Sequence, residues 1–206
     1  MAARAWIERV RRTGQLSYFV DSSVAGAWAT VITETLTEFD RISQRESLGV
    51  RFVATDQAPT DTAGADVQFA TGSGEVTINW NGAHNRIVDG VRLHGNTFTM
   101  ASEGEGTSKA FIYLPAQPQV NTPSGQRAVG TGVMKIIAFH EMLHACGLSN
   151  GEHSTDDVFN GYPSVTLDRS PAQDRVTIMV NGRYVHMPPI VMATGTINLI
   201  RGLWRA

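Results

Sequence analysis

The segment from position 140 to position 144 reads HEMLH, with two histidines four residues apart and a glutamate directly after the first. In an α-helix, residues four apart lie on the same face, so His140 and His144 can direct imidazole nitrogens at one metal ion. Glu141 would lie beside that metal, where its carboxylate can accept a proton from a zinc-bound water molecule. The spacing therefore predicts a Zn²⁺ site with Glu141 as general base. Because HExxH also occurs by chance, further ligands are needed to support this prediction.

A third ligand is expected from the segment that follows the helix. Gly147 tolerates the left-handed backbone that ends helices, so the chain can turn back toward the metal there. His153 is the favoured ligand, because three protein ligands and a water molecule form the usual catalytic zinc shell. A neutral amide such as Asn150 is a poorer zinc ligand than an imidazole, and the carboxylates of Asp156 and Asp157 are the remaining alternatives.

On these residues the chain resembles the metzincin zinc peptidases, and the matrixins in particular. Four positions of the family signature HExxHxxGxxH are matched, by His140, Glu141, His144 and Gly147. The last signature position falls on Asn150, but the segment GLSNGEHSTD becomes similar to the matrixin sequence GLSHSTD if residues 150–152 are an insertion. The resemblance implies a zinc-dependent endopeptidase that hydrolyses peptide or protein substrates, with His153 as the third metal ligand.

Two later segments carry the same resemblance. Met179, within TIMV at positions 177–180, stands where metzincins place the Met-turn beneath the metal, although a methionine that fills an ordinary core is the alternative. The stretch 192–204 is similar to the C-terminal helix that follows a matrixin Met-turn, which makes Met192 a core residue that precedes this helix. The chain departs from some metzincins in having no Tyr two residues after Met179.

The elements that must position the motif predict an α+β fold. Apolar residues at spacings of three and four predict a helix over about 25–42 that lies across a sheet. A long helix from about Arg127 to just before Gly147 carries the motif, and because it is apolar on most sides it is expected to be buried. Short apolar runs predict strands, with an Asn81-Gly82 turn among them, at 16–20, 50–54, 67–70, 76–80, 97–100, 111–114 and 176–180.

With the resemblance, the expected fold is metzincin-like. A twisted mixed β-sheet would pack with a backing helix and a buried zinc-site helix, followed by a C-terminal subdomain with the Met-turn and a terminal helix at 196–204. We expect one catalytic domain over residues 1–206, with an N-terminal subdomain of about 1–147 and a C-terminal subdomain of about 148–206. Substrate is expected along an edge strand, for which the segment preceding Phe111 is the candidate.

Composition narrows the range of partners. The chain has 206 residues, 42% of them hydrophobic, and 17 Lys and Arg against 19 Asp and Glu, so no basic footprint for nucleic acid is present. No apolar run approaches the roughly 20 residues that cross a bilayer, and no signal peptide is recognisable, so no membrane partner is expected. Compartment and oligomeric state stay open. Cys146 is the only cysteine, which excludes an internal disulfide, and it is expected to be buried and inert.

Two other functions remain open. Zinc could staple the loop that carries His153 to the helix in a non-catalytic binding module, although such a site has no need for Glu141 as a general base. The same centre could also serve a zinc amidase that acts on cell-wall peptides. Three other histidines have no partners at ligand spacing and are expected at the surface, namely His84, His94 and His186.

Overall fold

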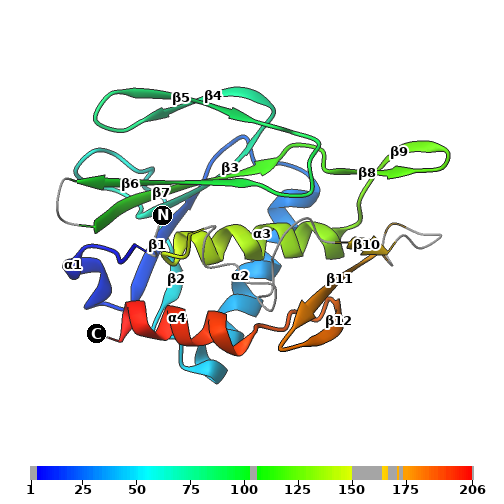
Figure 1. Cartoon of the computed structure of the whole chain (residues 1–206). Helices are drawn as coiled ribbons and strands as arrows, with labels where there is room; N and C mark the ends of the chain where they lie inside the picture. Colours follow the sequence, from blue (N-terminus) through cyan, green and yellow to red (C-terminus); the bar gives the residue numbers. More distant parts are fainter. Residues whose placement is uncertain (1–3, 103–105, 150–163, 167–170, 172–173, 206) are drawn as a thin grey trace.

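The computed structural model describes residues 4–102, 106–149, 164–166, 171 and 174–205. The chain has a mixed α+β fold (Figure 1). Its helices are α1 (Glu8–Arg11), α2 (Ala27–Glu46), α3 (Thr131–Ala145) and α4 (Thr194–Trp204). Its strands are β1 (Gln15–Val20), β2 (Arg51–Ala54), β3 (Val67–Gly72), β4 (Gly74–Asn79), β5 (Ala83–Val88), β6 (Asn96–Ser102), β7 (Gly106–Pro115), β8 (Gln119–Thr122), β9 (Gly125–Ala128), β10 (Ser164–Thr166), β11 (Arg175–Val180) and β12 (Arg183–Met187).

A five-stranded mixed sheet in the order β2-β1-β3-β7-β6 organises the molecule. The first four strands are parallel, whereas β6 pairs antiparallel with β7 and forms one edge. Side chains alternate between the faces of β7, so Ile112 and Leu114 join the main core while Phe111 and Tyr113 join a second cluster. The helices α2 and α3 lie on the main-core side, and the hairpin β4–β5 lies over the other face (Figure 1).

Three aromatic rings join the backing helix, the sheet and the motif helix. Phe39 on α2 is fully buried, and its ring centroid lies 5.0 Å from that of Phe52 on β2 and 5.6 Å from that of Phe139 on α3. Phe139 is the residue directly before His140, so this contact holds the helix turn that carries the motif. The predicted helix that lies across the sheet is confirmed as α2.

Two tryptophan side chains bind the C-terminal end of α3. Trp6 Nε1 donates to the carbonyl of Ala145 at 2.7 Å, and Trp204 Nε1 donates to the carbonyl of Cys146 at 2.9 Å. The last carbonyls of a helix have no partner within it, so these bonds satisfy groups that would otherwise be buried and unpaired. The two ends of the described chain thereby support the helix that carries the motif.

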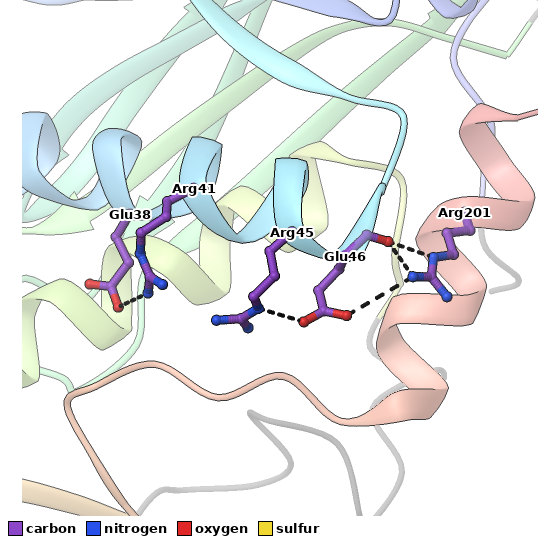
Figure 2. A network of polar contacts seen from close by, with 5 residues as sticks. All are labelled: Glu38, Arg41, Arg45, Glu46 and Arg201. Atoms are coloured by element: carbon purple, nitrogen blue, oxygen red, sulfur yellow. Dashed lines mark hydrogen bonds and ion pairs between the residues drawn. The ribbon is translucent and has the colours of Figure 1, made fainter.

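Polar contacts tie the terminal helix α4 to the end of α2 (Figure 2). Arg201 donates from Nε to the Glu46 carbonyl at 2.7 Å and from Nη2 to the same oxygen. A cation is favourable at the C-terminal end of a helix, where the partial charge is negative. Arg45 pairs with the Glu46 carboxylate at 2.7 Å, and Arg41 lies 3.7 Å from Glu38 one turn earlier. The predicted C-terminal helix is confirmed, and Arg201 bonds it to the C-terminal end of the backing helix.

The expected start of the motif helix near Arg127 is wrong. Residues 119–128 form the antiparallel hairpin β8–β9, in which Gln119 pairs with Ala128, and α3 begins only at Thr131. Gly125, with φ of 115°, permits the turn of this hairpin. The strands β5 and β12 also escaped prediction, because their sequences AHNRIV and RYVHM are largely polar or exposed. None of the described helices is both long enough and apolar enough to cross a membrane.

Candidate metal centre

The two motif histidines converge on one point above α3. His140 Nε2 and His144 Nε2 lie 3.0 Å apart, and the ring centroids are 4.7 Å apart. A tetrahedral zinc ion with Zn–N bonds of 2.0–2.1 Å holds two nitrogen ligands about 3.3 Å apart. The observed separation is therefore within a few tenths of an ångström of what such an ion requires. Both rings are part-buried, so they remain within reach of solvent.

The turn after α3 orients the second ring. His144 Nδ1 lies 2.9 Å from the carbonyl oxygen of Leu148, and since a carbonyl only accepts, Nδ1 carries the proton. Nε2 then carries no proton, which is the tautomer that a metal ligand needs. The chain reaches this position through Gly147, whose φ of 110° confirms its predicted role after the helix end. A Cβ there would also lie 2.6 Å from the carbonyl oxygen of Arg4.

Glu141 is buried beside the histidines and held by the start of the edge strand β6. Its side chain is 2% exposed, and Thr97 Oγ1 donates to Glu141 Oε2 at 2.7 Å. The backbone N–H of Gly95 donates to the same carboxylate. Burial raises the pKa of Glu141, whereas the neighbouring His144 and the bonds from Thr97 and Gly95 act in the opposite direction.

Position 95 accepts only glycine without rearrangement. A Cβ at Gly95 would lie 2.8 Å from Glu141 Cγ and 2.7 Å from the carbonyl oxygen of Tyr113, both shorter than real Cβ contacts. Neither Gly95 nor Thr97 was identified from the sequence. Thr97 is 44 positions from Glu141, so no local spacing could link the two residues.

The predicted third metal ligand lies outside the described residues. His153, Asn150, Asp156 and Asp157 all fall within the undescribed range 150–163, so His153 stays a prediction. Within the part of the chain that the structure describes, no group of three or more His, Cys, Asp or Glu side chains is placed to hold a metal ion. The described part of the candidate centre thus consists of two imidazoles, from His140 and His144, and the carboxyl group of Glu141.

Met179 lies in an extended segment. Its backbone belongs to β11 and pairs with Tyr184 of β12, and the turn between these strands falls at Asn181 and Gly182. The Met-turn assignment of Met179 is not tested by these contacts and stays a prediction. Met192 is buried two residues before α4, which confirms it as a core residue that leads into the terminal helix.

The remaining singled-out residues are structural. Cys146 is fully buried, which confirms the expected burial, and burial raises the pKa of its thiol, as an unreactive cysteine requires. His186 is exposed as expected. His84 and His94 are half-buried instead, with His84 Nε2 2.8 Å from the Trp80 carbonyl oxygen and the pKa of His94 lowered chiefly by burial.

Converging imidazole nitrogens suit zinc, copper, nickel or iron, whereas magnesium and calcium prefer oxygen ligands. A carboxyl group on the adjacent helix position adds a proton acceptor to this ligand pair. No protein-family model matches the chain, and no match to a curated protein was found. The geometry of His140, Glu141 and His144 is therefore the basis for the function proposed below.

Proposed function

We propose that this protein is a zinc-dependent endopeptidase of the metzincin type. The observation that carries the proposal is the 3.0 Å convergence of His140 Nε2 and His144 Nε2, with Glu141 held beside them on the same helix turn. His153 completes the ligand set in this proposal, and Met179 forms the Met-turn. The order of strands and helices in the N-terminal part, with a backing helix behind a mixed sheet, supports the metzincin-like architecture.

The residues of the chain would divide the chemistry as follows. His140, His144 and His153 would hold zinc, which would supply a Lewis acid to polarise a peptide carbonyl and to lower the pKa of a water molecule. His144 keeps its ligand nitrogen aligned through the bond from Nδ1 to the Leu148 carbonyl. Glu141 takes the proton of the attacking water and gives it to the leaving amine. Thr97 and Gly95 keep the Glu141 carboxylate in one orientation during both transfers.

The edge strand β6 is the proposed docking strand for the substrate backbone. It is the last strand of the main sheet, and it includes Thr97, which contacts Glu141. An extended peptide that pairs with an edge strand gains main-chain hydrogen bonds that do not depend on its sequence. Pairing along β6 would therefore bring a peptide bond close to Glu141. The segment directly before Phe111, which we expected to form the edge, is the first part of β7, an inner strand between β3 and β6.

One observation favours a second function. The Glu141 side chain is 2% exposed and already has two hydrogen-bond donors, as a purely structural carboxyl group would. In this second candidate the chain is a binding module in which zinc only fastens the segment after α3. The two candidates make opposite predictions for peptide hydrolysis.

Metal analysis combined with a peptide-library digest tests the proposed function. The expected result is one zinc ion per chain and cleavage at internal peptide bonds that a chelator abolishes and added zinc restores. Stoichiometric zinc without cleavage of any peptide would favour the binding module. A purified chain that neither retains zinc nor takes it up would contradict both candidates.

Replacement of the third ligand should weaken zinc binding more than replacement of its neighbour. We expect His153→Ala to lower zinc affinity by more than the roughly 10- to 100-fold that loss of an outer-shell partner costs. Asn150→Ala serves as the matched control and should leave the affinity within about 3-fold, because an amide is a weak zinc ligand. Competition with a chromophoric chelator measures both. If Asn150→Ala has the larger effect, the proposed insertion at 150–152 is wrong.

Thr97→Val should lower kcat roughly 10- to 100-fold, since a hydrogen bond to a charged group contributes about 1.5–3 kcal/mol. KM and zinc affinity should stay near the wild-type values, because the hydrogen bonds of the Thr97 hydroxyl go to Glu141. Thr97→Ser keeps the hydroxyl and should restore kcat. Thr99→Val, at an exposed position on the same strand, is the control. Equal kcat values for Thr97→Val and Thr99→Val would show that Thr97 does not orient Glu141.

A further inference from the structure

A cavity of about 470 Å³ lies on the face of the main sheet that is turned away from α3. Its floor contains Phe111 and Tyr113 of β7, whose neighbours Ile112 and Leu114 point into the main core on the other side. The strand β4 forms one wall, and Asp21 and Ser23, which follow β1, form part of the rim. The volume falls within the range of about 300–1,000 Å³ that small-molecule sites occupy. None of His140, Glu141 and His144 lines this cavity, so it is separate from the candidate metal centre.

Hydrogen bonds hold the rim of the cavity. Thr71 and Ser23, which both line it, are joined by two hydrogen bonds, from the Thr71 N–H to Ser23 Oγ at 3.1 Å and from Thr71 Oγ1 to the Ser23 carbonyl at 2.7 Å. Asp61 Oδ1 accepts the Asn81 N–H at 2.7 Å, which ties the turn of hairpin β4–β5 to the loop that carries Pro59. A site whose walls are already ordered loses less entropy when a ligand binds.

A buried ammonium group anchors the same loop. Lys109 is 2% exposed, and its Nζ donates to the carbonyls of Ala63, Gly64 and Ala65 at 2.9, 3.1 and 2.8 Å. A buried charge needs such partners, since an unpaired one is costly. Lys109 therefore holds the loop that includes Pro59, which lines the cavity. Lys109 itself does not line the cavity.

The charged side chains of the lining are of one sign, negative. Asp21 is its only carboxylate, and it contains no Lys, Arg or His. Asp21 Oδ1 accepts the Ser23 N–H at 2.8 Å, and no ion pair of the described residues includes Asp21. The negative charge of Asp21 reaches the phenol of Tyr113, whose pKa is raised first by burial and then by that charge. The cavity thus presents one carboxylate and several neutral polar side chains beside the aromatic and aliphatic side chains of Phe111, Tyr113 and Ile78.

We propose that this cavity binds an organic cation, an alkylammonium group on an apolar stem. The ammonium would lie against the Asp21 carboxylate near Tyr113, and the stem would pack on Ile78 and Phe111. A bare divalent metal fits less well, because calcium takes six to eight oxygen ligands that include several carboxylates, and this lining has one carboxylate beside neutral polar and apolar side chains. Free amines and the lysine side chain of a polypeptide share this chemistry. The site is separate from the proposed peptidase centre and does not depend on it.

Titration of the full chain followed by ¹H–¹⁵N correlation NMR tests the proposal. We expect saturable binding of n-butylammonium, with the shifted amides centred on Asp21, Thr71 and Tyr113, and no saturable binding of the neutral analogue 1-butanol. The arm with Nα-acetyl-lysine methylamide distinguishes the source. Tighter binding than n-butylammonium supports a polypeptide side chain as the ligand, and weaker or equal binding supports a free amine.

Asp21→Asn keeps an oxygen that can accept the Ser23 N–H. It should lower the affinity for n-butylammonium roughly 10- to 100-fold, as expected for loss of a charge-assisted hydrogen bond. Tyr113→Phe, which retains the ring, should lower this affinity by a smaller factor. Asp56→Asn, an exposed carboxylate outside the lining, should leave binding unchanged. The proposal is overturned if neither cation saturates, if 1-butanol binds equally well, or if Asp21→Asn and Asp56→Asn bind alike.

Discussion

We expect Glu141→Gln to retain zinc and to lower kcat for the proposed peptide hydrolysis roughly 100- to 10,000-fold, the range that a general acid–base group contributes. Glutamine has nearly the same shape and keeps an oxygen that can accept the Thr97 hydroxyl, but it cannot take a proton from water at neutral pH. The buried position of Glu141 makes this isosteric change preferable to alanine, which would leave a cavity beside the metal ligands. Steady-state kinetics on a cleaved library peptide and metal analysis of the same sample measure both outcomes.

The matched control for Glu141→Gln is the zinc-depleted wild-type chain, which should be equally inactive but recover on addition of zinc. The variant should not recover. Unfolding by urea with zinc present should show that Glu141→Gln has kept the fold. A variant that binds zinc and cleaves peptide at the wild-type rate would remove Glu141 from the mechanism.

Phe39→Ala lowers the free energy of unfolding by about 3–5 kcal/mol, the cost of deleting a fully buried aromatic side chain. Phe39 is 0% exposed and contacts the rings of both Phe52 and Phe139, so its loss opens a cavity between the backing helix, the sheet and α3. In a domain of this size each 1 kcal/mol corresponds to roughly 2–4 °C in Tm. Urea titration with chelator present measures the change without the contribution of bound metal.

Tyr184→Ala provides the comparison for Phe39→Ala. Tyr184 is 76% exposed, so its truncation should change stability by no more than about 0.5 kcal/mol. If Phe39→Ala costs less than about 1 kcal/mol, the neighbouring rings have closed the cavity and the three elements do not depend on this contact.

The strands of the main sheet were largely predictable from the sequence, because each contains a short apolar run and most have buried residues; in β2 only Phe52 is even half-buried. The runs at 16–20, 50–54, 67–70 and 111–114 correspond to β1, β2, β3 and β7. The hairpin strands β5, β8, β9 and β12 were not, since polar and exposed side chains leave no periodic signal. Pairing with a neighbour, rather than local preference, makes these segments extended. The helix start near Arg127 failed for this reason.

In the candidate centre too, some features could be predicted from the sequence and others depend on the tertiary structure. The spacing of His140 and His144 determined by itself that the two imidazoles share a face, because the geometry of a helix is local and repeats every few residues. The left-handed turn at Gly147 and the burial of Cys146 were likewise readable from short segments. Only the tertiary structure decided that β6 is the edge strand and that Gly95 and Thr97 hold Glu141. It alone placed Asp21 at the rim of a cavity floored by Phe111. These contacts join residues more than 40 positions apart, and their partners are set by strand order and by the side of the sheet on which each element packs.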